Sequence, residues 1–89
     1  MQLHVVVRGR VQGVGFRWFV RETARKLELA GWVMNRADGG VEVAADGESS
    51  RIQSLCAALR AGPRGSVVAD LEELPPYPDD LPSPFAITR

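Results

Sequence analysis

The sequence has few residues that could form a disulfide framework or a metal centre. Its 89 residues include one cysteine, Cys56, and one histidine, His4. A single cysteine cannot form an intramolecular disulfide, and one cysteine with one histidine is too small a set for a zinc or copper site. We therefore expect no metal and no cofactor, and we expect a cytoplasmic location because the chain makes so little use of cysteine.

Long hydrophobic runs are also missing. A membrane-spanning helix needs about 20 consecutive apolar residues, and no run in this chain approaches that length. The first residues, MQLHVVVRGR, have neither the basic start nor the small-residue cleavage site of a signal peptide. These absences argue against a membrane partner.

An excess of either charge is absent from the chain as a whole. Eleven Lys and Arg side chains balance eleven Asp and Glu, which argues against a dedicated nucleic-acid binder. The distribution is uneven, however. Residues 1–36 hold seven basic and two acidic side chains, whereas residues 37–89 hold four basic and nine acidic ones. The basic part would suit a small anionic ligand, although a chance distribution of surface charge is the alternative.

Hydrophobic periodicity predicts an alternation of strands and helices. Apolar residues repeat with helical spacing after Phe16, in a helix that Gly31 is expected to end, and again from Ser50 to Gly62. Ser50 and Gln53 have the spacing of a capping box at the start of the second helix. Alternating apolar residues predict strands at Leu3–Val7, Trp32–Ala37, Val41–Ala45, Val67–Leu71 and Phe85–Arg89.

This order predicts an α+β fold, a ferredoxin-like βαββαβ sandwich. We expect an antiparallel sheet of four to five strands with two helices on one face, and residues 1–89 forming one domain. Residues 74–84 carry five of the six prolines and are expected to form an ordered, extended loop. The fold alone does not identify a function.

Several functions found on this plan lack their residues here. An RNA-binding version needs aromatic rings on its third strand, and VEVAADG has none. His4 is expected to be a structural or surface residue and Cys56 a small core residue. Trp18 could touch a ligand, but partial burial at the edge of the first helix is the simpler expectation.

The glycine-rich segment between the first strand and the first helix is the best candidate for a site. Gly9, Gly13 and Gly15 precede a helix N-terminus, where backbone N–H groups converge and bind anions. The segment is neither a Walker A loop nor a dinucleotide-binding fingerprint. A plain tight turn is the alternative. Arg17 favours the anion site, because a cation at a helix N-terminus opposes the helix dipole unless an anion compensates it.

Two segments resemble the signatures of the acylphosphatase family. Residues 7–17, VRGRVQGVGFR, resemble the first signature. Residues 31–35, GWVMN, resemble the second together with Gly39, Val41 and Gly47. The resemblance implies a hydrolase that splits the carboxyl–phosphate bond of small acyl phosphates into a carboxylate and inorganic phosphate without a metal. We expect such an enzyme to be a monomer.

The resemblance also implies the residues of the site. Arg17 and Asn35 would be the catalytic side chains, and the phosphate would be bound by Gln12, Gly13, Val14, Gly15, Phe16 and Arg17. The chemistry of these groups agrees, because phosphoryl transfer needs positioning and charge stabilisation. Asn35 offers an acceptor and a donor that can hold a water in line with the phosphorus.

Two other functions remain open from the sequence. The same loop could serve a regulatory module that binds a phosphate-bearing ligand without reacting with it. It could also belong to a carbamoyl-phosphate-handling domain of the kind found at the head of larger maturation proteins. We expect the enzyme, because a sensor has no need of Asn35 and because the chain stops at residue 89.

Overall fold

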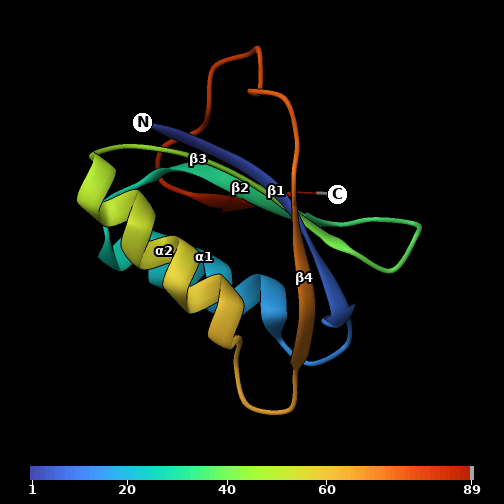
Figure 1. Cartoon of the computed structure of the whole chain (residues 1–89). Helices are drawn as coiled ribbons and strands as arrows, with labels where there is room; N and C mark the ends of the chain where they lie inside the picture. Colours follow the sequence, from blue (N-terminus) through green and yellow to red (C-terminus); the bar gives the residue numbers. More distant parts are fainter. Residues whose placement is uncertain (89) are drawn as a thin grey trace.

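Strands and helices follow one another in the predicted order. The protein is described here from a computed structural model that covers residues 1–88. In Figure 1, both helices lie on the same face of the sheet. The elements are β1 (Gln2–Arg10), α1 (Phe16–Lys26), β2 (Ala30–Asn35), β3 (Val41–Asp46), α2 (Ser49–Ala61), β4 (Val67–Glu73) and β5 (Ala86–Ile87).

The five strands form one sheet in the order β4-β1-β3-β2-β5. The four longer strands pair with antiparallel neighbours, which confirms the ferredoxin-like βαββαβ plan. The sheet is mixed rather than wholly antiparallel, because β5 runs parallel to β2 and pairs Trp32 with Ala86 and Val33 with Ile87. Residues 74–84 carry the chain from the β4 edge to the opposite edge of the sheet, where β5 is added.

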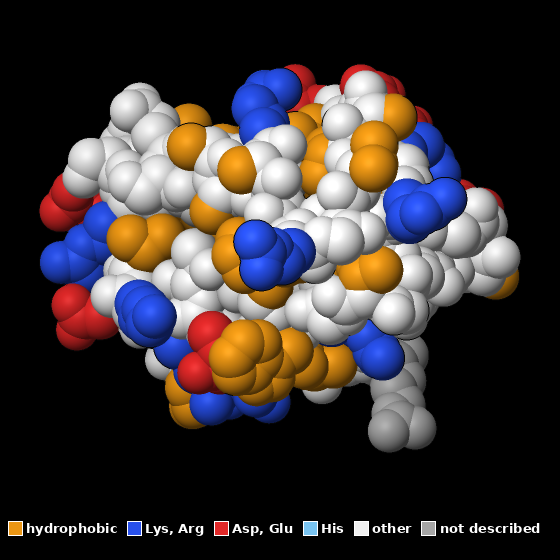
Figure 2. Space-filling view, turned by 90° about the horizontal axis from the view of Figure 1, so that it is seen from below, with side chains coloured by type: hydrophobic (Ala, Val, Ile, Leu, Met, Phe, Trp, Pro, Cys, Tyr) orange, Lys and Arg blue, Asp and Glu red, His pale blue; other side chains and the backbone are white. Residues whose placement is uncertain are grey.

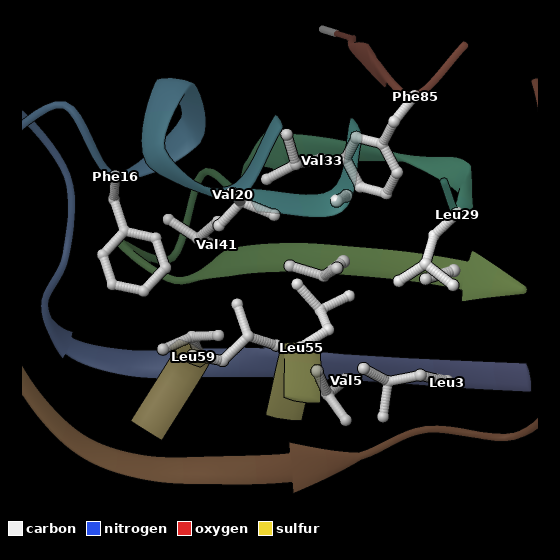
Figure 3. Packing of buried hydrophobic residues seen from close by; sticks show 14 of the residues in the cluster. Leu3, Val5, Phe16, Val20, Leu29, Val33, Val41, Leu55, Leu59 and Phe85 are labelled. Atoms are coloured by element: carbon white, nitrogen blue, oxygen red, sulfur yellow. The ribbon is translucent and has the colours of Figure 1, made fainter. Parts of the chain in front are cut away.

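The hydrophobic core lies between the sheet and the two helices. Figure 3 shows Phe16 and Val20 of α1, and Leu55 and Leu59 of α2, among the buried side chains that line this layer. The strands contribute their alternate residues, among them Val5, Val33, Val41 and Val43. Each fully buried side chain of this size stabilises the fold by about 1.5–3 kcal/mol. Because buried residues of this core lie at both ends of the β1–α1 connection, their packing holds that connection in place.

The face of the sheet opposite the helices also buries apolar side chains. Val6 is fully buried there, and the His4 ring packs edge-on against Trp32 and Tyr77, with centroid distances of 6.0 and 5.6 Å. Residues 74–84 cross this face, where the Tyr77 N–H donates to Gln2 Oε1 at 2.7 Å. Residues 74–84 therefore form an ordered, extended loop that covers this face of the sheet.

The expected role of Gly31 as the stop of the first helix is wrong. The helix ends earlier, and Glu28 takes the left-handed conformation with a φ of 56°. The N–H of Glu28 donates to the Arg25 carbonyl, and the N–H of Leu29 donates to that of Ala24, both at 3.0 Å. These two bonds form a Schellman motif, which a non-glycine residue rarely permits. Gly31 instead lies inside β2.

Two other local predictions need correction. The N-cap of α2 is Glu48, so the capping box expected from Ser50 and Gln53 is wrong, although Gly62 does end this helix. In β4, Val68 rather than Val67 packs against the core. The register shifts opposite Arg8 and Gly9, so one extra β4 residue is accommodated there and the alternation changes face.

Candidate active site

The β1–α1 connection is a tight loop fixed at both ends by buried side chains. Val11 is 1% exposed and Phe16 is 2% exposed. Between them, Gly13 and Gly15 have φ values of 76° and 75°, a conformation that side chains with a Cβ adopt at a cost. The sequence VQGVGF therefore folds into a turn whose exposed part is mostly backbone.

The N-terminus of α1 opens directly onto this loop. Gly15 is its N-cap residue, and the first helical bond runs from the Phe19 N–H to the Gly15 carbonyl at 3.0 Å. Within the described residues no side chain caps this end, and its first turn holds no acidic residue. The N–H groups at the start of the helix and the positive end of its dipole make a favourable environment for an anion.

A pocket of about 470 Å³ lies at this end of the helix. It is formed by the β1–α1 loop, the start of α1, the end of β2 and the short β5. Arg17 and Asn35, the two predicted catalytic residues, both line it. The lining residues are Val11, Gly13, Gly15, Phe16, Arg17, Trp18, Asn35 and Ile87.

Not every residue of the predicted phosphate loop faces the pocket with its side chain. The Val14 side chain packs against the hydrophobic core. The Gln12 side chain donates to the carbonyls of Arg36 and Gly40 in the β2–β3 hairpin. Of the predicted phosphate loop, the structure thus brings Gly13, Gly15, Phe16 and Arg17 to the pocket, whereas Gln12 and Val14 do not line it.

Arg17 is half-buried and differs from the paired arginines nearby. Arg8 and Arg36 both form ion pairs with Asp38, at 3.3 and 3.1 Å. Arg17 forms no ion pair within residues 1–88. The end of the molecule with the β1–α1 and α2–β4 loops shows spaced Lys and Arg side chains, with acidic ones mostly toward the margin (Figure 2). A guanidinium in this setting can pair with an external anion.

Asn35 ends β2, where it pairs with Val41 of β3. Its Oδ1 atom is buried and has no hydrogen-bond partner within the described part of the chain. A buried acceptor without a donor costs about 1–3 kcal/mol and calls for an explanation. At the wall of a polar pocket, such an acceptor suits a ligand that donates a hydrogen bond.

Sequence reasoning missed Val11 and Ile87 of this pocket, and it gave a ligand contact of Trp18 only as the alternative. Trp18 was expected to be partly buried, yet it is 60% exposed. Val11 lies inside the recognised segment, so its place beside the loop could have been inferred. Ile87 arrives through the parallel pairing of β5 with β2, and no local pattern indicates that contact.

The remaining chemically interesting residues lie away from the pocket. His4 is on the outer face of the sheet, with Nε2 2.7 Å from Glu42 Oε2 and Nδ1 2.7 Å from the Pro75 carbonyl oxygen. Burial raises the pKa of the Cys56 thiol, which favours the protonated, less nucleophilic form. Residues 1–88 contain no helix of the length and apolarity that a membrane crossing requires.

Comparison with known proteins agrees with the geometry. The family model described as Acylphosphatase matches residues 3–87. An acylphosphatase of Koribacter versatilis is 57% identical over 67 residues, which cover 75% of this chain and 61% of that relative's length.

Solved structures match over the whole chain. The crystal structure of acylphosphatase from Bacillus subtilis is 42% identical, with a TM-score of 0.90 and coverage of 99% of this chain and 98% of the other. The crystal structure of T. kodakarensis HypF is 30% identical with a TM-score of 0.85, and the match covers 100% of this chain and 12% of the other.

Proposed function

The chain belongs to the acylphosphatase family, a family of enzymes, and we propose that it hydrolyses small acyl phosphates to a carboxylate and inorganic phosphate. The observation that carries this proposal is the shared pocket of Arg17 and Asn35 at the N-terminus of α1. One side chain brings positive charge and the other brings a neutral amide. This combination fits an anionic substrate that is attacked by water.

In this proposal the loop from Gln12 to Arg17 binds the phosphate. Backbone N–H groups and the Arg17 guanidinium donate to the phosphoryl oxygens, and their contacts tighten as charge redistributes in the transition state. Positive charge from these groups takes the place of a metal ion. Residues 1–89 act as a single acylphosphatase-like domain.

Asn35 holds the attacking water in line with the phosphorus. The buried Oδ1 atom supports this role, because it is an acceptor that a water can satisfy. The water oxygen forms the new bond to phosphorus while the bond from phosphorus to the acyl oxygen breaks. The carboxylate leaves with that electron pair and needs no general acid, and the phosphate itself accepts the proton of the water.

The direct test is release of inorganic phosphate from acetyl phosphate by the purified protein. Turnover should persist in excess chelator, and added inorganic phosphate should inhibit competitively. Loss of turnover in chelator with recovery on adding magnesium would overturn the metal-free mechanism. Binding of phosphate without any turnover would instead support a regulatory module.

We also propose that the enzyme acts as a monomer in the cytoplasm, without a nucleic-acid or membrane partner. Both predicted catalytic residues, Arg17 and Asn35, line the same pocket of one chain, so the site does not need a second copy to be complete. Light scattering across a concentration series checks this. A mass of two chains at the lowest concentration that supports full activity would contradict it.

A further inference from the structure

Gln12 lies within the predicted phosphate loop, but its side chain is committed elsewhere. Its Nε2 atom donates to the Arg36 carbonyl at 2.8 Å and to the Gly40 carbonyl at 2.9 Å. Both bonds are partly buried, so both N–H groups of the amide are used within the protein. The side chain therefore does not donate to a bound phosphate.

The two carbonyls stand at the mouth of the β2–β3 hairpin. The Arg36 N–H donates to the Gly40 carbonyl at 2.8 Å, and the Gly39 N–H donates to the Arg36 carbonyl at 3.2 Å. These two backbone bonds close the β2–β3 hairpin, and the Gln12 side chain binds to it from the β1–α1 loop. Arg36 directly follows Asn35. One of the carbonyls that Gln12 binds therefore belongs to the residue next to Asn35, which lines the pocket.

We propose that Gln12 is a positioning residue that sets the phosphate loop against Asn35. This rests on the proposed function, because it concerns the distance between a bound phosphate and the water held by Asn35. The two groups come from separate parts of the sequence, and Gln12 joins those parts by two side-chain bonds. Misplacing reacting groups by about 1 Å can cost 10²-fold in rate.

The test is a double-mutant cycle with Gln12→Met and Asn35→Ala. Methionine has a similar length and no N–H donor, so Gln12→Met removes both bonds with little change in shape. We expect it to lower kcat by about tenfold or more and to change the phosphate inhibition constant by less than about twofold. In the Asn35→Ala background, the same change should lower the residual kcat little further. Gln53→Met, on the exposed surface of α2, is the matched control and should match the parent.

Each failure has its own signature. If Gln12→Met lowers kcat equally with and without Asn35, or weakens phosphate inhibition in proportion, Gln12 does not act through Asn35 and the inference is wrong. Normal turnover by Asn35→Ala alone would instead overturn the water role in the proposed function. If Gln12→Met melts below the assay temperature, Gln12→Asn carries the same test, since its shorter amide cannot reach both carbonyls.

A separate observation concerns the acyl part of the substrate. Trp18 is 60% exposed beside Arg17, and it shares the pocket wall with Val11 and Ile87. A large aromatic side chain exposed at a pocket is a surface suited to apolar, planar groups. We infer that the acyl group of the substrate lies against the Trp18 indole, and that acyl phosphates with a planar apolar acyl group are preferred.

This preference is measured as a ratio. Trp18→Ala should lower kcat/KM for benzoyl phosphate by about tenfold more than for acetyl phosphate, because only the larger acyl group reaches the indole. Trp18→Phe should recover much of the ratio. Equal losses for the two substrates would overturn the acyl contact. Absence of turnover with both substrates in the parent protein would count against the proposed function instead.

Discussion

The ring of Phe85 lies against the backbone of Gly31, so closely that a Cβ at position 31 would come within 2.6 Å of the ring. The Gly31 N–H also donates to the Pro82 carbonyl at 2.8 Å. Together these contacts hold in place the segment that leads into β5. Since β5 carries Ile87 to the pocket, a glycine far from the reacting groups helps to complete the site.

Gly31→Ala should therefore destabilise the protein. The added methyl group would collide with the Ala44 carbonyl as well as with the Phe85 ring, and overpacking of this kind costs about 1–3 kcal/mol or more. A thermal melt measures the loss. Gly31 and Gly65 both have a positive φ, which is 90° at Gly65, but a Cβ at Gly65 would lie in open space. Gly65→Ala is therefore a suitable control. Equal losses in the two variants would show that backbone strain, not the close contact, governs position 31.

Arg17→Gln should weaken both phosphate binding and turnover. In the proposed mechanism, Arg17 touches the phosphate before and during the reaction, so its loss affects both states. Removing one such donor typically lowers the rate by about 10²- to 10³-fold. Kinetics with acetyl phosphate and the inhibition constant of inorganic phosphate provide the measurement. Phosphate inhibition as strong as in the parent would rule out direct contact between Arg17 and the anion.

Asn35→Ala should abolish most turnover and leave phosphate inhibition nearly unchanged. Its amide is assigned to the water, so the interaction it makes contributes only to the chemical step. The same two measurements apply, with a melt to verify folding. A weakened phosphate inhibition would make Asn35 a ligand of the anion and would contradict its assignment to the water.

Gly15→Val should reduce anion binding more than stability. The φ of 75° at this position is costly for a β-branched residue, so the loop would move away from its present shape. The expected result is a smaller rise in melting temperature on adding phosphate. Gly65→Val, in the α2–β4 loop with a φ of 90°, controls for strain outside the loop. An undiminished rise in Gly15→Val would place the anion site elsewhere.

Asp38 should make a stabilising contribution that disappears in acid. Its pKa is lowered, first by the hydrogen bond from the Gly40 N–H and then by Arg36 and Arg8. A carboxyl whose pKa is lower in the folded state stabilises the fold above its unfolded-state pKa and loses that effect as the pH falls through the folded value. Urea unfolding of the parent and Asp38→Asn should differ at neutral pH and converge in strong acid. A constant difference at all pH values would contradict this.

The predictable part of the fold was the part that local patterns encode. Alternation in β1 and β3 and helical spacing in α1 follow from which face each residue buries, so the order of elements emerged correctly. The ends did not. α1 ends at Lys26 and is closed by a left-handed Glu28, whereas sequence preference alone favours Gly31 for that task. The change of face in β4 depends on its register with β1, which its own sequence does not contain.

The candidate site likewise has a part that local sequence patterns predict and a part that they do not. Arg17 and Asn35 are found from two sequence segments, and the structure places both on one pocket wall. The direction of the Gln12 side chain could not be predicted, because its partners are backbone carbonyls of another segment. Ile87 was missed for a related reason, since only the parallel pairing of β5 brings it near the loop.

The register shift in β4 also bears on how copies of the protein behave in a crowded solution. β4 is an edge strand, and a long flat edge is a template on which another chain can add by backbone pairing. Here the extra residue twists the strand, and Asp70 and Glu73 place negative charge along it, while Glu72 pairs with Arg8. Like charge and an irregular shape both disfavour the pairing of two such edges, so we expect this edge to resist strand addition by another copy.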